Sequence, residues 1–398
     1  MKKRLILIGA LLIAVILALF ALYTFTAQNG LSSNVSIYCW SPFVLSEGSY
    51  PAIHEYFQEL GITRVYQELS EEYLERPETA EAIQRLSDDH IEVVALLGKR
   101  SWGLKESQLD DVKGYVDALS KYNAGIGVNH PIRKIALDVE TYTYTSWKEN
   151  PKTYFAHYIA KMREIYDYAH DAGLAVVQVI PVHYDDIDKV LFREFVKTCC
   201  DELSLMNYTI STQISGIENE VALCRKWNMP LETAFETMPY SEKYSVTDEK
   251  TYYYKGFRAL QSRRAEILKT YNYRGLSTAY HHFPTMYHVT TGNYLAEIYA
   301  YTNSADPTRN ELGQTDAVET LILTGDDGNT ITAGLYNPNL DAEYAESCYL
   351  AVGIRPDVTY TITSGNEKYT VENGTEIFVL SGEEPIDYAS VRLKRVKQ

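Results

Sequence analysis

The chain has 398 residues, of which 45% are hydrophobic and 23% charged, as is typical of a globular protein. This length accommodates one large domain and one small one. The formal net charge of −16 argues against an extended basic surface, so nucleic acid is not expected as a partner.

The N-terminus predicts a membrane segment. A basic tripeptide at 2–4 precedes an apolar run from residue 5 to about 25, which is long enough to span a bilayer with its basic flank in the cytoplasm. The nearest cleavage-like triplet, Phe25-Thr26-Ala27, starts with a large residue, so an uncleaved anchor is favoured over a removed signal peptide. Residues 1–28 are therefore expected to form a single-pass transmembrane signal-anchor in the cell membrane, with the bulk of the chain extracellular.

The middle of the chain alternates between strand-like and helix-favouring segments. The expected strands are 35–40, 62–68, 91–97, 135–140, 175–182, 203–208, 231–236 and 276–282. Eight strands with helices between them predict an α/β fold, a (β/α)8 TIM barrel that forms the catalytic domain over 34–312. Residues 292–301 are expected to be its last helix. The alternative, an open doubly wound sheet, is weakened because no glycine-rich phosphate loop follows the first strand.

From about residue 316 the pattern changes to short alternating runs separated by Gly, Asn and Asp. This pattern predicts a small all-β sandwich, an accessory domain over 316–398. Among the five cysteines, Cys199, Cys200 and Cys224 leave a disulfide possible, although buried thiols are the simpler expectation.

Two carboxylates end the fourth expected strand. Residues alternate faces along a strand, so Asp138 and Glu140 share the face opposite the apolar residues at 135, 137 and 139. The last inward residues of a barrel strand reach the rim where barrel active sites lie. Two acids this close cannot both ionise freely, and a retained carboxylic acid is what glycoside cleavage requires.

Other strand ends supply further candidates. Glu236 would end the seventh strand as a second carboxylate, and Tyr208 would end the sixth. The expected substrate-binding residues are Tyr38, Trp40, Glu68, Trp102, His183, Met206, Tyr280 and His282. No metal and no cofactor is expected, because the spacing of Asp138, His183, Asp185 and Asp186 is not diagnostic of a metal site.

Two of these strand ends resemble a known family. Asp138-Val139-Glu140 resembles the end of the fourth-strand signature of family 18 chitinase-like glycoside hydrolases, and Met206-Asn207-Tyr208 resembles their sixth-strand Met-x-Tyr. The resemblance implies that Glu140 is the general acid and that Asp138 orients a substrate N-acetyl group, which attacks in place of a protein nucleophile. It also implies that Tyr208 steadies that group.

Alternatives remain open at this point. Lys134 and Ala136 stand where family 18 carries further acids, and the local match to family 25 muramidases is as good. A mechanism without a substrate acetamide would use Glu140 as the acid and Glu236 as the nucleophile.

We therefore predict an extracellular, membrane-anchored glycoside hydrolase that acts on cell-wall or other polysaccharides by carboxylate acid/base catalysis. The alternative is a non-hydrolytic glycan-binding barrel, and a weaker one is a metal-dependent hydrolase or deacetylase. The sequence makes no prediction of the oligomeric state.

Overall fold

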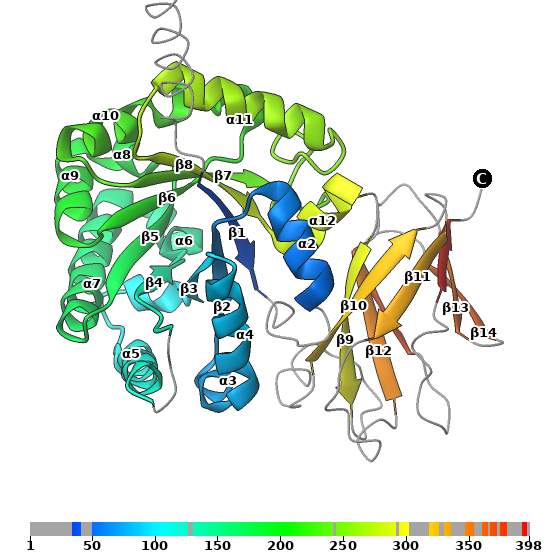
Figure 1. The fold of residues 1–398 in the computed structure, drawn as a ribbon. Helices are drawn as coiled ribbons and strands as arrows, with labels where there is room; N and C mark the ends of the chain where they lie inside the picture. Colours follow the sequence, from blue (N-terminus) through cyan, green and yellow to red (C-terminus); the bar gives the residue numbers. More distant parts are fainter. Residues whose placement is uncertain are drawn as a thin grey trace, which may run out of the picture.

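The computed structural model describes residues 34–40, 50–125, 130–241 and 244–291, together with eight strands between residues 294 and 395 (Figure 1). The expected anchor at 1–28 lies outside the described residues. Within the described part of the chain, no helix combines the length and apolarity needed to cross a bilayer.

Eight parallel strands close into a barrel in sequential order, so the predicted TIM barrel is confirmed (Figure 1). The strands are β1 (Val35–Cys39), β2 (Arg64–Glu68), β3 (Glu92–Leu97), β4 (Lys134–Leu137), β5 (Ala175–Pro181), β6 (Glu202–Met206), β7 (Leu231–Glu236) and β8 (Leu276–His281). Each lies within one residue of a predicted strand or inside it, because buried parallel strands are short apolar runs that alternate with helical segments.

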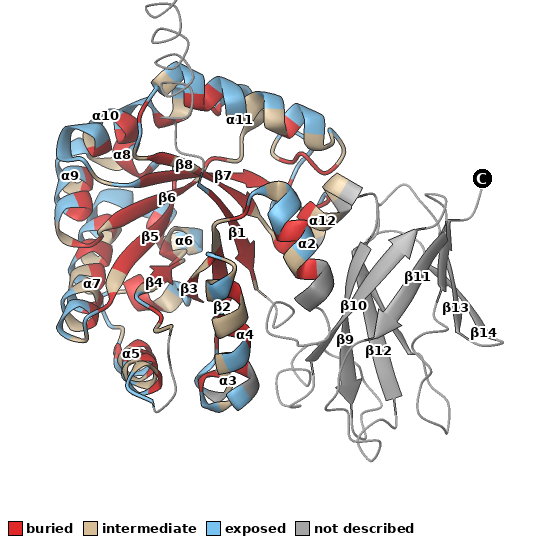
Figure 2. Ribbon diagram, in the orientation of Figure 1, coloured by how far each residue is buried: buried red, intermediate tan, exposed pale blue. Residues whose placement is uncertain are grey.

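Helices cover the outside of the barrel, with their buried faces toward the strands (Figure 2). They are α2 (Tyr50–Leu60), α3 (Glu71–Glu75), α4 (Pro77–Asp88), α5 (Asp110–Asn123), α6 (Thr145–Glu149), α7 (Pro151–Asp171), α8 (Tyr184–Ile187), α9 (Lys189–Thr198), α10 (Glu218–Trp227), α11 (Phe257–Tyr271) and α12 (Phe283–Thr291). Short 3₁₀ turns η2 (Arg100–Gly103), η3 (Thr141–Thr143), η4 (Ile210–Thr212) and η5 (Ser215–Ile217) lie in the loops after β3, β4 and β6.

Local residues explain where the longest helix begins and ends. Pro151 is the first residue of α7, where its missing N–H costs no hydrogen bond. Gly173 follows the helix with a φ of 77°, a left-handed conformation that only glycine adopts without strain. The helix therefore begins and ends where Pro151 and Gly173 favour it.

The strands divide the apolar core into two parts. Outward residues such as Ile135, Leu137 and Val139 of the fourth strand and the segment after it pack beneath the helices. Inward residues, such as Ala136, fill the barrel interior with aromatic and small aliphatic side chains from the other strands. The face that carries Ala136 is therefore the inward one, as the alternation along this strand predicts.

A charged network closes the N-terminal end of the barrel. The guanidinium of Arg64 lies 2.6 Å from a Glu92 carboxylate oxygen and 2.7 Å from one of Glu202. The ammonium of Lys134 contacts the same two carboxylates, at 3.1 Å from Glu92. Burial raises the pKa of Glu202, but Arg64 and Lys134 lower it by more, so the net pKa is low. Lys134 therefore has a structural role at the position where family 18 carries an acid.

Above this network, an aromatic and hydroxyl layer fills the barrel. The rings of Tyr38 and Tyr66 stack at 4.4 Å, and the Tyr38 hydroxyl donates to Ser204 Oγ at 2.7 Å. Ser204 in turn donates to the buried Glu232 at 2.9 Å. Tyr38 is only 2% exposed, so its predicted role as a sugar-stacking ring is wrong: it lies inside the packed interior, below the rim.

The third strand approaches the fourth closely just before the rim. Gly98 lies where an added Cβ would be 2.4 Å from the backbone oxygen of Asp138. The Asp138 N–H donates to Leu97 O at 2.7 Å, so this backbone cannot easily move away. Only glycine fits, and its absent side chain permits the chain path that carries Asp138 and Glu140.

Replacing Gly98 by alanine is therefore expected to destabilise the fold by about 1–3 kcal/mol through overpacking. Gly114 in α5 is the matched control, because its added Cβ would meet only a Glu71 side-chain oxygen at 3.7 Å. Gly114→Ala is expected to stabilise by about 0.4–1 kcal/mol. Urea unfolding of the two variants measures both values; equal effects of the two changes would contradict the close approach.

The C-terminal residues form an antiparallel sheet in the order β14-β13-β16-β11-β10-β9-β12-β15. Its strands are β9 (Tyr294–Tyr301), β10 (Val318–Gly325), β11 (Thr330–Leu335), β12 (Ser347–Gly353), β13 (Tyr360–Ser364), β14 (Glu367–Val371), β15 (Thr375–Val379) and β16 (Arg392–Arg395). The helix predicted at 292–301 is wrong. That segment is strand β9, which pairs with β10 and β12, and it contains Ile298 and the tyrosines at 294, 299 and 301, which are residue types that favour strands. The sandwich packing of the sheet stays a prediction.

The described cysteines are free thiols. Cys39, Cys199, Cys200 and Cys224 are all buried and unbridged, so the bridge left open between Cys199 or Cys200 and Cys224 does not form. Burial raises the pKa of Cys224 to about 12, which leaves this thiol protonated and inert at neutral pH.

Candidate active site

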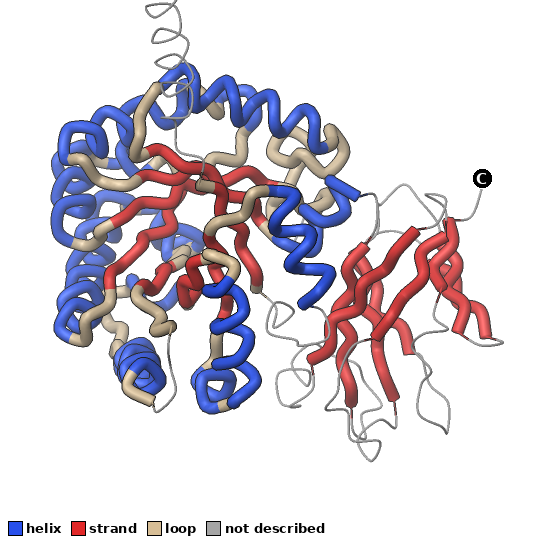
Figure 3. The backbone as a smooth tube through the Cα atoms, in the orientation of Figure 1, coloured by secondary structure: helices blue, strands red, loops and turns tan. Residues whose placement is uncertain are grey.

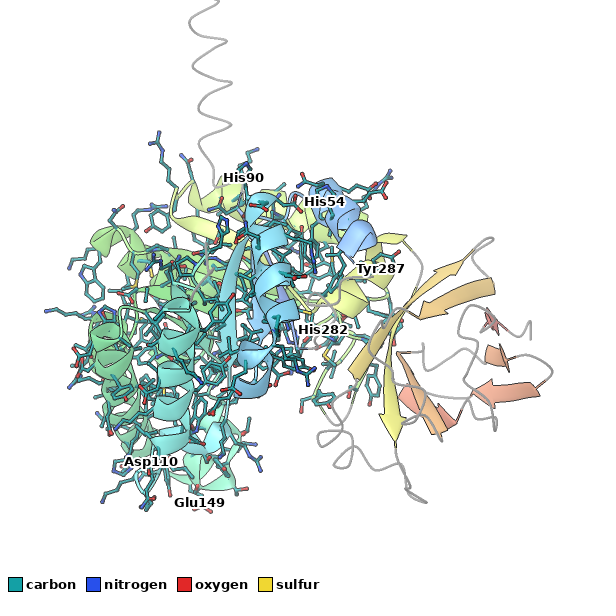
Figure 4. All side chains as sticks on the ribbon, turned by 60° about the horizontal axis from the view of Figure 1, so that its bottom comes forward. His54, His90, Asp110, Glu149, His282 and Tyr287 are labelled. Carbon is teal, nitrogen blue, oxygen red and sulfur yellow. The ribbon has the colours of Figure 1, made fainter. Side chains whose placement is uncertain are left out.

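The C-terminal ends of the barrel strands all open at one end of the molecule. His90, which precedes β3, lies at the opposite end from Asp110 and Glu149, which follow β3 and β4 (Figure 4). Loops and short turns connect strands to helices at this rim (Figure 3). Barrel active sites are built from such loops and from the last inward side chains of the strands.

Asp138 and Glu140 lie directly after β4, at this rim. Val139 between them is buried beneath the helices, so the two acids lie on the inward side. Asp138 Oδ1 is buried and has no hydrogen-bond partner among the described residues. A buried carboxyl oxygen without a donor is costly, and a ligand donor or a retained proton relieves that cost.

Asp138 holds its proton unusually tightly. Burial raises its pKa most, the neighbouring Glu140 raises it further, and His281 partly opposes both, for a pKa of about 7. The ordinary value of an aspartic acid is 3.8. The prediction that one acid of this pair keeps its proton near neutrality therefore agrees with the electrostatics of the folded protein.

This raised pKa predicts how stability depends on pH. The folded state binds the Asp138 proton more tightly than the unfolded chain, so the stabilisation is complete below about pH 4 and is lost as pH rises through about 7. Asp138→Asn removes this dependence, so the variant should gain stability relative to wild type as pH rises from about 4 to about 8. Denaturant titrations at several pH values measure the difference, with the exposed Asp110→Asn as control. A wild-type-minus-variant difference that stays constant with pH would contradict the assignment.

Glu140 is held by the residue two positions further on. The Tyr142 hydroxyl donates to Glu140 Oε1. The Tyr142 ring in turn meets the His183 ring edge-on at 5.5 Å. Burial first, and then Glu140, raise the pKa of Tyr142 far above its ordinary value, so this hydroxyl stays a donor. Tyr142 thus fixes one oxygen of Glu140 and leaves the other for a ligand.

Glu236 and His281 form a second pair at the rim. The register of β7 and β8 places the two residues side by side. Glu236 is 2% exposed and accepts from the Met238 N–H at 2.8 Å, while His281 Nδ1 lies 3.2 Å from both Glu236 oxygens. The Trp40 indole donates to His281 Nε2 at 3.3 Å. Because an indole N–H only donates, this geometry assigns the imidazole proton to Nδ1, directed at Glu236.

Several acids act together on the pKa of His281. Burial lowers this pKa, but Glu236, Asp138 and Glu140 raise it by more, and the net value is above the ordinary one. Asp138, Glu140 and Glu236 all act on this one imidazole. The acids after the fourth strand and at the end of the seventh therefore act electrostatically on the same side chain of the eighth.

Tyr208 joins the same group from the sixth strand. Its ring lies 5.8 Å from the His281 ring. Burial raises its pKa well above 10, and Glu236, Asp138 and Glu140 add to the effect. Tyr208 and Met206 both pack against the inner core, as residues two apart near the end of one strand can.

Two predicted substrate-binding rings do not reach the rim. Tyr280 is fully buried on the outward face of β8, where its hydroxyl accepts from Gln261 Nε2 at 2.8 Å. The inward face of β8 carries Ala279 and His281 instead, so the prediction of Tyr280 as a substrate-binding residue is wrong by one position along the strand. Trp102 is buried in η2, and its indole donates to Asp111 at 2.8 Å, so it packs in the outer core and presents no free face to a sugar.

The remaining predicted substrate-binding residues are Trp40, His282, His183 and Glu68. Trp40 is half-buried and touches His281 directly. His282 is half-buried with its ring 5.5 Å from that of His281, and His183 is exposed beside Tyr142. Glu68 is exposed at the end of β2.

Sequence reasoning missed His281 and Tyr142 as members of the site. The small inward residues Ser277 and Ala279 precede His281, and such residues, alternating with Leu276 and Thr278, are the signal that could have assigned the inward face. Tyr142 lies in a 3₁₀ turn after the strand, where no alternation applies.

The residues named as a conceivable metal site do not gather. Across the described ranges of the chain, no set of three or more His, Cys, Asp or Glu side chains is arranged to hold a metal ion. Asp185 instead accepts from Asn219 Nδ2 at 2.6 Å, on the outer side of the barrel.

Comparisons with known proteins add little to this picture. No family model and no curated protein sequence matches the chain. Among solved structures, the D-psicose 3-epimerase of Clostridium cellulolyticum H10 is 14% identical, with 63% of this chain and 85% of that chain covered and a TM-score of 0.38. A chitinase of Chromobacterium violaceum ATCC 12472 is 12% identical, with 62% and 93% covered and a TM-score of 0.38.

The spore cortex-lytic enzyme SleL of Bacillus megaterium QM B1551 is also 12% identical, with 64% of this chain and 72% of that chain covered and a TM-score of 0.39. At such identities and TM-scores these likenesses carry no argument. A functional assignment therefore depends on the chemistry of the rim residues.

Proposed function

We propose that this barrel is a glycoside hydrolase that cleaves polysaccharide by carboxylate acid/base catalysis. One observation carries the proposal: Asp138 and Glu140 after β4 and Glu236 at the end of β7 all raise the pKa of His281, whose ring lies 5.8 Å from that of Tyr208. Burial and Glu140 raise the pKa of one of these acids, Asp138, to about 7. Paired carboxyl groups with pKa values pushed apart by their surroundings are the requirement of glycosidic bond cleavage.

In this proposal Glu140 is the general acid. It protonates the leaving glycosidic oxygen through the carboxyl oxygen that Tyr142 does not hold. Asp138, which is coupled electrostatically to Glu140, holds the shared proton between turnovers. The buried Oδ1 of Asp138 accepts a hydrogen bond from substrate, for which an acetamide N–H or a hydroxyl is suitable.

Glu236 is the second carboxylate. The Met238 N–H and His281 fix its orientation, so its charge is preorganised for the oxocarbenium ion that develops at the sugar. Two mechanisms are compatible with this arrangement. In one, Glu236 attacks the sugar directly as the nucleophile; in the other, an acetamide group of the substrate attacks in its place. Tyr208 and Trp40 brace the reacting sugar from either side of His281.

The proposed substrates are cell-wall or other extracellular polysaccharides. This part of the proposal rests on the apolar segment near the N-terminus, for which we propose a membrane anchor with the barrel outside the cell. The overall acidity of the chain is compatible with a glycan and unfavourable for nucleic acid.

A second candidate function is glycan binding without cleavage. The observation that favours it is the charged network at the N-terminal end of the barrel. There Lys134 pairs with Glu92 and Glu202, at a position where family 18 carries an acid. A barrel with this change would retain the rim aromatics and lose turnover.

A panel of polysaccharides separates the two functions. Purified protein is expected to release new reducing ends from at least one wall-type glycan, detected by mass spectrometry, and to do so after exhaustive chelation. Binding to a glycan without any release across the panel would favour the binding barrel. Activity lost on chelation and restored by metal would instead favour a metal-dependent hydrolase.

A further inference from the structure

A cavity of about 320 Å³ lies on the flank of the barrel, away from the inward side of the strands. It opens between α8, α9 and α10, which neighbour one another on one side of the barrel (Figure 1). The lining residues that bear chemistry are Asp185, Lys189, Arg193, Asn219, Lys226 and Trp227. None of these residues belongs to the candidate active site.

Three cationic side chains without an ion-pair partner among the described residues line this cavity. Lys189, Arg193 and Lys226 are exposed, and within the described part of the chain they form no ion pair and no side-chain hydrogen bond. The chain as a whole carries a net charge of −16. A cluster of unpaired cations on so acidic a protein attracts anions locally, because lining charges of one sign focus the potential in a hollow.

The same cavity offers an apolar surface. Trp227 ends α10 with 37% of its surface exposed, although large aromatic residues are usually buried. Phe192 and Leu223 form apolar lining beside it. An exposed indole next to apolar side chains suits the C–H face of a sugar ring better than it suits water.

The inner end of the cavity is polar. Asn219 Nδ2 donates to Asp185 Oδ2 at 2.6 Å, and Asp185 is buried. Glu220 beside it is 1% exposed with an Oε1 that has no partner, and burial first and then Asp185 raise its pKa to about 8. Glu220 therefore stays neutral and adds no second charge, so the cavity keeps a net positive lining with one carboxylate as a hydroxyl acceptor.

We propose that this cavity is a second carbohydrate-binding site, specific for an anionic saccharide. The saccharide ring stacks on Trp227, its acidic groups pair with Arg193, Lys226 and Lys189, and its hydroxyls bond to Asp185 and Asn219. The choice of a saccharide as ligand rests on the proposed function, whereas the preference for negative charge rests on the cavity alone.

The position of the cavity fits a long substrate. Tyr184, next to Asp185 in the chain, is buried with its ring 6.1 Å from that of Tyr142, which holds Glu140. The Asp185 end of the cavity therefore lies near Tyr142, and the Trp227 end lies where α10 leads into β7, toward the opposite end of the barrel. A polysaccharide chain bound in this cavity would have a second attachment to the protein, which raises the effective concentration of the chain.

The test uses the full chain labelled with 5-fluorotryptophan. Trp227 reports on the cavity and Trp40 on the rim, and the variants Trp227→Phe and Trp40→Phe assign their fluorine resonances. A short oligogalacturonate is expected to shift the Trp227 resonance in a saturable way, and a neutral chito-oligosaccharide of equal length is not. The double change Arg193→Ala and Lys226→Ala should weaken the oligogalacturonate affinity about tenfold or more, whereas Lys197→Ala, an exposed cation of α9 outside the cavity, should leave it unchanged.

The two resonances separate this proposal from the proposed function. A Trp227 shift without hydrolysis of any glycan would retain the second site and reject the enzyme. Hydrolysis with a Trp227 resonance that does not respond, or responds equally to the neutral oligosaccharide, would overturn the second site and leave the enzyme standing. An affinity that is unchanged in the Arg193 and Lys226 double variant would also overturn it.

Discussion

Replacing Glu140 by glutamine is expected to lower the rate of glycan hydrolysis by about 10²–10⁴-fold, because the amide cannot protonate the leaving oxygen. The change is nearly isosteric, and the Tyr142 hydroxyl can still donate to the amide oxygen. Glycan binding should therefore persist while turnover is lost. Reducing-end release and binding by calorimetry, measured on the same preparation, give the two values.

Glu149→Gln is the matched control for this change. Glu149 is an exposed carboxylate of α6 at the same end of the barrel, on its outer edge (Figure 4). Its replacement should leave both hydrolysis and binding at the wild-type level. Full activity in Glu140→Gln, with an unchanged unfolding midpoint, would remove Glu140 from the catalytic role.

Replacing Glu236 by glutamine is expected to reduce hydrolysis by about 10²–10³-fold, because the preorganised negative charge beside the reacting sugar is lost. The same change should lower the pKa of His281, since Glu236 is the strongest of the charges that raise it. The proton resonances of the His281 ring, followed against pH, measure that shift without reference to activity.

His183 serves as the internal control in the same titration. Partial desolvation of its ring lowers its pKa, although the side chain is largely exposed, and the acids that oppose the shift are Asp186 and Asp185. The loss of Glu236 should therefore leave its titration unchanged. A His281 pKa that does not move in Glu236→Gln would contradict the pairing at 3.2 Å.

The truncated variant Glu236→Ala distinguishes the two mechanisms. Azide added to this variant should form a glycosyl azide if Glu236 is the nucleophile, because a small anion can occupy the space of the missing carboxylate. If a substrate acetamide attacks instead, azide should have no effect and activity should depend on the N-acetyl group of the substrate.

Much of the fold follows from patterns that are local in the sequence. Apolar runs separated by helix-favouring segments were enough to predict all eight barrel strands, since each buried strand and each helix start is defined by a few neighbouring residues. The alternation along residues 134–140 likewise predicted that Asp138 and Glu140 face inward, because Ile135, Leu137 and Val139 are unambiguously apolar.

Elsewhere the local pattern was ambiguous. In β8, the small size of Ser277 and Ala279 is the one local sign of the inward face, and by itself it does not decide that Tyr280 faces the helices and His281 the rim. Register decides it: β7 pairs Glu236 with His281. Trp102 has an aromatic ring suited to a sugar, yet its neighbours in space bury it.

The sequence by itself thus determined the number and order of the barrel strands and the acidic strand end at Asp138 and Glu140, because these depend on contacts between near neighbours. Only the tertiary structure decided which acid retains a proton, that His281 joins the rim, and that three cations gather beside Trp227. Burial, charge coupling and strand register act between residues far apart in the chain, and no short window of sequence contains them.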